Sequence, residues 1–217
     1  MRVKRIILSA LLFVALAALK ATASPLGIMV PAYFSPGAKW DAMDYAASRV
    51  PLIAIMDVNN GPGTSKSSSY VTALANLHAA GGKVTGYVYT SYTNRPLAQV
   101  EADIDTYLAW YDVDGFFVDE MASDSGPDTI AYYASLYQYI KSKGARYSVT
   151  GNPGSNTQEA YLSTPTVDCL MNFESPSNSY VNFTPSSWVK NYPATNFVHL
   201  PYGVGGTTAL TNFVTSP

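Results

Sequence analysis

Short, β-prone apolar segments alternate with longer, helix-like stretches from residue 27 onward. A strand buried in a parallel sheet is apolar on both faces, and a helix returns the chain to the start of the next strand. The alternation therefore predicts an α/β fold built from repeated strand–helix units. The expected strands span residues 27–34, 52–57, 83–89, 115–119, 147–150, 169–173 and 196–200, and the expected helices span 39–48, 68–80, 97–110, 128–143, 157–162, 185–190 and 207–214.

The strand count bears on how the sheet closes. A closed (β/α)8-type TIM barrel needs eight strands, whereas we expect seven here, followed by a helix-like stretch that runs to the end of the sequence. Three interpretations are open: the sequence stops short of the last strand, the barrel is incomplete, or the pattern hides an irregular strand. We favour truncation after the seventh unit, with residues 24–217 forming a single barrel domain that lacks its C-terminal end.

The first residues have the parts of a secretory signal peptide. A basic start at Arg2, Lys4 and Arg5 precedes an apolar core at 6–19 and a small-residue cleavage site at 21–23. The apolar core is too short to favour a membrane span. We therefore expect residues 1–23 to be removed, the mature chain to begin near Ser24, and the protein to be secreted.

Charge is scarce, which limits the expected partners. Charged residues make up 13% of the chain, with a formal net charge of −2, against roughly 25% charged residues in average proteins. Neither nucleic acid nor a membrane is an expected partner, because both attract basic surfaces. The 17 tyrosines and three tryptophans supply rings that suit sugar faces, so we expect a polysaccharide as the binding partner. We also expect the protein to be a monomer.

The cysteine and histidine residues do not form a recognisable metal-binding motif. No Cys and His cluster has metal-ligand spacing, and the single Cys169 lies inside an apolar segment, where a buried inert thiol is the better interpretation. We expect no metal and no cofactor.

Carboxylates follow two of the expected strands. One apolar run ends on Asp119 and Glu120, and another ends on Glu174. Catalytic groups of α/β barrels come from these strand ends, and glycoside hydrolysis needs two carboxyl groups. A single acid at a strand end is as readily a helix cap or a solvated group, but two such sites favour chemistry.

Strand alternation separates the two neighbouring acids. Asp119 shares a face with Phe117, whereas Glu120 shares the other face with Val118. Unless the chain bends there, only one of the acids points into the barrel. The smaller side chain favours Asp119, and Glu120 would then bind substrate or tune its neighbour.

The remaining strand ends supply candidate substrate-binding residues. The loops at 59–63 and 152–154 also have the composition of ordinary turns, which is the stronger interpretation for either loop alone. His199 fits a packed position in the barrel wall equally well. The candidates are Tyr33, Asn59, Asn60, Tyr89, Arg95, Asn152, Asn172, His199 and Tyr202.

Six segments in order resemble the spherulation-specific (spherulin-4-like) family. They lie at 60–63, 86–90 with Arg95, 115–120, 152–154, 173–174 and 198–199, and the match runs through nearly all of the mature chain. The resemblance implies a secreted (β/α)-barrel glycoside hydrolase that cuts α-1,4-linked N-acetylgalactosamine in the exopolysaccharide galactosaminogalactan. The competing hypotheses are a polysaccharide-binding protein without turnover and a structural protein of a spore or cell wall.

The resemblance also implies roles for the acids. The family's paired acids after strand four correspond to Asp119 and Glu120, and its acid after strand six corresponds to Glu174. Glu174 is then the nucleophile and Asp119 the general acid/base of a retaining mechanism, with Glu120 in substrate binding or as the alternative acid. Tyr89 and Thr93 differ from the residues that the family often has there, which bears on sugar preference, and the family's chains usually continue further.

Overall fold

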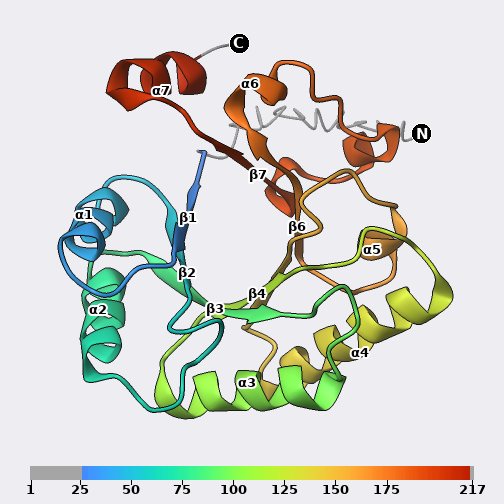
Figure 1. Ribbon diagram of the computed structural model, residues 1–217, viewed down its shortest axis with the longest axis horizontal. Helices are drawn as coiled ribbons and strands as arrows, with labels where there is room; N and C mark the ends of the chain where they lie inside the picture. The colour runs from blue at the N-terminus through green and yellow to red at the C-terminus, as the bar shows by residue number, and fades with distance from the viewer. Residues whose placement is uncertain (1–25, 216–217) are drawn as a thin grey trace, which may run out of the picture.

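The computed structural model describes residues 26–215. Seven parallel strands lie in chain order in one sheet that curls into a nearly closed barrel, with helices on its outer side (Figure 1). This confirms the expected barrel fold. The expected signal peptide, residues 1–23, and the start of the mature chain at Ser24 lie outside the described residues.

The strands follow the apolar segments closely. Their bounds are β1 (Ile28–Ala32), β2 (Leu52–Met56), β3 (Lys83–Tyr89), β4 (Gly115–Asp119), β5 (Ser148–Gly151), β6 (Cys169–Pro176) and β7 (Phe197–Tyr202). The expected bounds of β3 and β4 are confirmed, and β6 and β7 run on past the expected ends. These two strands pair with each other as far as Pro176 and Tyr202.

The longer helices also match the sequence pattern. They are α1 (Ala38–Ala47), α2 (Ser68–Ala79), α3 (Leu97–Trp110), α4 (Pro127–Lys143) and α7 (Gly206–Thr215), and single turns form α5 (Ala160–Ser163) and α6 (Ser177–Tyr180). The expected helix at 185–190 is instead a 3-10 helix, Ser187–Asn191, and a second 3-10 helix covers Ala194–Asn196. Periodicity did not predict α6, because one turn is too short to show a helical repeat.

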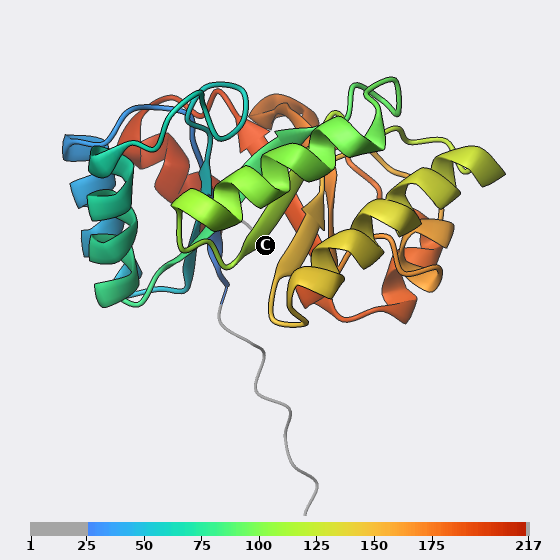
Figure 2. The same cartoon turned by 90° about the horizontal axis from the view of Figure 1, so that it is seen from below.

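Helices and sheet enclose the larger of two apolar cores. α1 and α2 cover one side of the barrel and α3 and α4 cross the outside of the next strands (Figure 2). Trp40 of α1, Leu77 of α2, Ile104 of α3 and Ile140 of α4 are all buried in this outer core. On α4, Tyr133, Leu136 and Ile140 form the face that is buried in this core.

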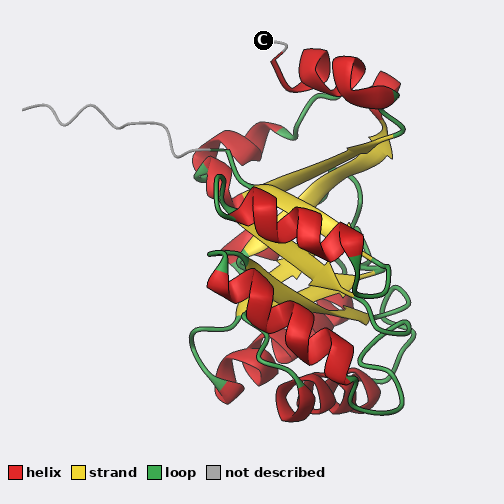
Figure 3. Ribbon diagram, turned by 90° about the vertical axis from the view of Figure 1, so that its left-hand side faces the viewer, coloured by secondary structure: helices red, strands yellow, loops and turns green. Residues whose placement is uncertain are grey.

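The β1 and β7 edges are not paired with each other among the described residues. Figure 3 shows the sheet from the side, with α7 beyond the end of β7. Phe213 of α7 packs against Tyr180 of α6, while Leu210 and Val214 are exposed. No helix in residues 26–215 is both long enough and apolar enough to cross a bilayer.

Close packing at the start of β4 generates a stability prediction. A Cβ atom added to Gly115 would overlap the backbone carbonyl oxygen of Ser148 on the neighbouring β5. Backbone cannot move aside as a flexible side chain can, so Gly115→Ala should destabilise the fold by about 3 kcal/mol. For a chain of this size we expect a fall of roughly 6 to 12 °C in Tm.

Gly205→Ala is the matched control, because nothing lies within 4 Å of a Cβ atom there. It should leave Tm nearly unchanged. Equal Tm values for the two variants in thermal melts would contradict the packing described at Gly115.

Candidate active site

The inner faces of the strands form a second, smaller apolar cluster inside the barrel. Ile55, Tyr87, Phe117 and Met171 are buried there, and Met29, Tyr89, Val198 and Leu200 pack against them. Side chains one or two residues further along these strands lie at their C-terminal ends. The candidate site is therefore a group of acidic and aromatic side chains at the C-terminal end of the inner apolar cluster.

Alternation along β4 directs Asp119 inward. Phe117 belongs to the inner cluster, whereas Phe116 and Val118 are buried in the outer core. Asp119 follows Phe117 by two residues and pairs in register with Tyr89 of β3. The structure thus places Asp119 on the inner face, as the strand period predicts.

Glu120 escapes this alternation because the chain turns at that residue. Its φ is 49°, in the left-handed region that a residue with a side chain seldom adopts. Burial and the charge of Asp119 raise the pKa of Tyr87, an inner-face residue, and the charge of Glu120 adds to this effect. Both neighbouring acids therefore lie near the same hydroxyl group.

Buried Thr90 supports this turn. Its backbone N–H donates to the Asp119 carbonyl oxygen at 3.1 Å, and its Oγ1 donates to the Glu120 carbonyl oxygen at 2.8 Å. The three residues that follow, Ser91, Tyr92 and Thr93, all have positive φ values of 47°, 55° and 74°. Such strain is typical of functional sites, and here it borders the pair of acids.

A β-bulge directs Glu174 into the barrel. Leu170 packs in the outer core and Met171 in the inner cluster, so unbroken alternation would turn Glu174 outward. The β6–β7 pairing shifts register between Met171 and Phe173, which leaves Asn172 as an extra residue. Glu174 then pairs with inward-facing Leu200, as expected where a bulge re-aims a side chain.

Asn152, at the end of β5, joins the two inward-facing acids. Its Nδ2 donates to Asp119 Oδ1 at 2.8 Å and to Glu174 Oε2 at 2.7 Å. Because one nitrogen makes both bonds, the two oxygen atoms lie no more than about 5.5 Å apart. The structure therefore brings the acids after strands four and six to a common site.

Two tyrosines and a further acid complete the inner site. Burial, together with the charge of Asp119, raises the pKa values of Tyr33 and Tyr87 far above their usual range, so both hydroxyls remain protonated donors. The Tyr87 hydroxyl lies near the Asp119 carboxyl group. Burial also raises the pKa of Asp57, although backbone N–H groups of Gly61 and Asn60 oppose this effect.

Sequence reasoning missed Asp57 and Tyr87 as site residues. Asp57 directly follows the apolar strand β2, which is the same signal that identified Asp119. Its Oδ1 accepts a hydrogen bond from the backbone N–H of Gly61 at 2.9 Å, so it also shapes the loop that carries Asn59 and Asn60. Both asparagines are exposed on that loop.

Arg95 supports the site rather than facing it. Its guanidinium donates to Asp103 at 2.6 Å and to the Tyr89 carbonyl oxygen at 3.2 Å. It also lies over the Tyr89 ring, 4.3 Å from the ring centroid. Tyr89 itself packs on the inner cluster, and Tyr202 is exposed at the end of β7.

The structure does not bring His199 to this group. Its neighbours Val198 and Leu200 pack on the inner cluster, so His199 faces outward. There its Nδ1 lies 2.6 Å from the Tyr180 hydroxyl, and its ring contacts Phe173 and Phe183. The position is a packed one behind the sheet, which is the alternative interpretation that the sequence allowed.

Asn172 lies beside the site rather than within it. The whole residue is 1% exposed, and neither its Nδ2 nor its Oδ1 has a hydrogen-bond partner among the described residues. It lines a pocket of about 340 Å³ together with Gly154, Ser155, Asn156, Phe173, Ser175 and Phe183.

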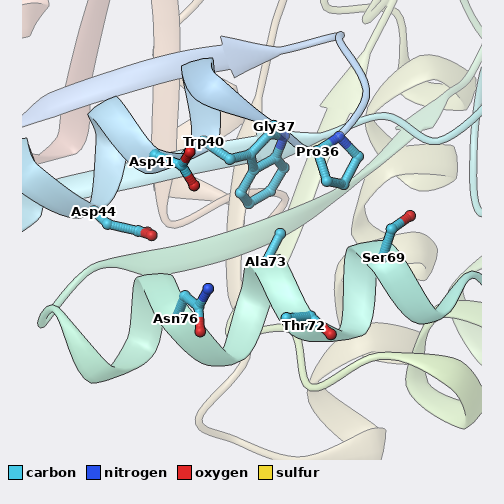
Figure 4. A pocket seen from close by; sticks show the side chains of 9 residues that line it. All are labelled: Pro36, Gly37, Trp40, Asp41, Asp44, Ser69, Thr72, Ala73 and Asn76. Atoms are coloured by element: carbon cyan, nitrogen blue, oxygen red, sulfur yellow. The ribbon is translucent and has the colours of Figure 1, made fainter.

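A second pocket of about 330 Å³ lies between α1 and α2 (Figure 4). Trp40, Asp41 and Asp44 line it from α1, and Ser69, Thr72 and Asn76 line it from α2. These helices cover the outer face of the sheet, so this pocket is separate from the acids inside the barrel.

Other reactive groups are few. Within residues 26–215 no group of three or more His, Cys, Asp or Glu side chains is arranged to hold a metal ion. Burial raises the pKa of the Cys169 thiol to about 12, so the thiol is uncharged at neutral pH.

Comparison with known proteins identifies the family. Residues 27–216 match the spherulation-specific family 4. The chain belongs to this family. It is 38% identical over 176 residues to Spherulin-4 of Physarum polycephalum, a match that covers 80% of this chain and 52% of that protein. The chain thus spans about half the length of this family member.

A solved structure is similar over most of both chains. The crystal structure of Aspergillus clavatus Sph3 in complex with GalNAc matches with a TM-score of 0.73 and 25% sequence identity, covering 88% of this chain and 84% of that chain. This chain therefore has a glycoside hydrolase-like barrel fold like that of Sph3.

The position of His199 generates a prediction about pH. Burial lowers the pKa of this imidazole, so the folded state binds its proton less readily than the unfolded state does. Its contribution to stability is complete above about pH 6.5 and is lost as the pH falls below that value. Between pH 7.5 and 5, the wild-type protein should therefore lose more in Tm than His199→Gln does. Equal losses in the two proteins would contradict a buried, neutral His199.

Proposed function

We propose that this protein is a secreted retaining glycoside hydrolase that cleaves an exopolysaccharide containing α-1,4-linked N-acetylgalactosamine. The observation that carries the proposal is the pairing of Asp119 and Glu174 through Asn152, with their nearest oxygens no more than about 5.5 Å apart. Retaining glycosidases place their two carboxyl groups about this far apart, whereas inverting enzymes leave room for a water molecule between them.

The chemistry divides between the two carboxyl groups. Glu174 attacks the anomeric carbon and forms a covalent glycosyl–enzyme, while Asp119 protonates the departing glycosidic oxygen. In the second step Asp119 removes a proton from water, which attacks the anomeric carbon and releases Glu174. Tyr33 and Tyr87 remain protonated and donate hydrogen bonds to the acids or to sugar oxygens. Glu120 binds substrate or adjusts the charge around Asp119.

The substrate assignment rests on similarity. Sph3, whose structure was determined with GalNAc, shares the fold over most of its length. Exposed Tyr92 and Tyr202, with partly exposed Tyr33, provide aromatic surface near the ends of the strands, and such rings suit sugar faces.

Incubation of the secreted protein with a panel of purified polysaccharides tests the function directly. The proposal predicts new reducing ends and N-acetylgalactosamine oligosaccharides from polymers that contain α-1,4-linked N-acetylgalactosamine. Binding without new reducing ends would support the alternative of a polysaccharide-binding protein. The absence of both binding and cleavage for every polymer would contradict the proposed function.

The nucleophile assignment makes a sharp mutational prediction. Glu174→Gln keeps the size of the side chain but replaces the nucleophilic carboxylate with a neutral amide, so kcat should fall by about 1000-fold or more. Substrate binding should remain measurable by calorimetry. Glu101→Gln on α3, outside the barrel, is the matched control and should retain wild-type rates. Wild-type turnover by Glu174→Gln would rule out this nucleophile.

The roles of Asp119 and Glu120 separate by leaving-group dependence. A general acid matters most for a poor leaving group, so Asp119→Asn should lose about 100-fold or more on the polymer and retain more activity on an activated aryl glycoside. Added azide should partly rescue its deglycosylation step. Glu120→Gln should mainly raise KM.

The same comparison reveals the opposite assignment. If Glu120→Gln shows the leaving-group dependence and the azide rescue, the two roles must be exchanged. If neither variant shows them, neither residue is the general acid.

A further inference from the structure

We propose that Asn152 is a positioning residue for the two carboxylates, rather than a residue that binds sugar. The inference rests on the proposed function, and it departs from the substrate-binding role that the sequence indicated. The Asn152 side chain is buried, with the whole residue only 8% exposed. Both hydrogens of its amide are used by Asp119 and Glu174.

The backbone around Asn152 is bonded to both carboxylate-bearing strands. Its N–H donates to the Val118 carbonyl oxygen of β4 at 2.8 Å. Two residues later, the Gly154 carbonyl oxygen accepts the N–H of Glu174 of β6 at 2.9 Å. Gly154 has a φ of +65°, which favours glycine. The segment 152–154 therefore connects the residue before Asp119 directly to Glu174.

The Asn152 amide also provides hydrogen-bond donors to two carboxyl groups that have no cationic partner within residues 26–215. Among the described residues, no ion pair within 4.0 Å involves Asp119, Glu120 or Glu174, so no lysine or arginine neutralises the two carboxyl groups. A carboxamide supplies two donors and has no proton to lose in the pH range of the reaction. It can hold both acids throughout the catalytic cycle without entering the proton transfers.

The orientation of the amide is determined by the same charges. Asn152 Oδ1 is buried and has no hydrogen-bond partner among the described residues. The reversed orientation would place this oxygen against Asp119 and Glu174, where it would meet two acceptors and no donor. The two charge-assisted hydrogen bonds from Nδ2 therefore outweigh the missing hydrogen bond at Oδ1.

Kinetics of Asn152→Ala and Asn152→Asp test the role. Displacement of both carboxylates should lower kcat on the polymer by about 100-fold, because misplacement of catalytic groups by about 1 Å has this effect. KM should change by less than about threefold. Asn152→Asp keeps the shape but replaces the donors with a third negative charge, so it should be at least as impaired. Asn76→Ala on α2 is the control.

An activated aryl glycoside separates positioning from acid catalysis. Both chemical steps depend on the placement of the two carboxylates, so the loss in Asn152→Ala should persist on this substrate, unlike that of Asp119→Asn. A raised KM with wild-type kcat would instead mean that Asn152 binds sugar, which would overturn the proposal.

Thermal melts at pH 7 test the interaction without any turnover. Asn152→Ala should lower Tm by about 5 °C in the wild-type background. In an Asp119→Asn/Glu174→Gln background the loss should be about half of that or less, because neutral hydrogen bonds are weaker than charge-assisted ones. Equal losses would show a merely structural asparagine and overturn the proposal. If no glycan is cleaved by the wild type, the proposed function fails, and the melts still decide whether Asn152 holds the acids.

Discussion

Two carboxyl groups lie side by side at the C-terminal edge of this sheet, and a single neutral amide donates a hydrogen bond to each of them. At an oxygen separation of no more than about 5.5 Å and an effective dielectric constant near 20, their repulsion when both are ionised costs about 3 kcal/mol or more. The parallel register, the bulge in β6 and the turn at Glu120 all serve this arrangement. Burial of the outer and inner apolar cores stabilises the fold and offsets this repulsion.

Much of the barrel could be predicted because its signals are local. The apolar runs at 83–89 and 115–119 gave β3 and β4 their bounds, and the strand period placed Asp119 on the face of Phe117. The direction of Glu174 could not be predicted in this way. It depends on the register between β6 and β7, which is a property of two paired strands rather than of one sequence.

Other features of the site could not be predicted from the sequence for similar reasons. The left-handed conformation of Glu120 is supported by Thr90 and Tyr92, which lie on a different strand–loop segment. For β7, both faces carry apolar residues, so alternation alone could not tell whether His199 points inward or outward. Asp57 carried a usable signal, a carboxylate directly after an apolar strand, but the turn composition that follows drew the interpretation toward a loop.

The stereochemistry of the first product tests the central claim most directly, namely that the Asp119–Glu174 spacing supports a double displacement. Proton NMR recorded during the first minutes of hydrolysis distinguishes the anomers before they equilibrate in solution. The account predicts that the newly formed reducing end keeps the α configuration of the bond that was cut. Initial formation of the β anomer would show inversion and would contradict the retaining mechanism.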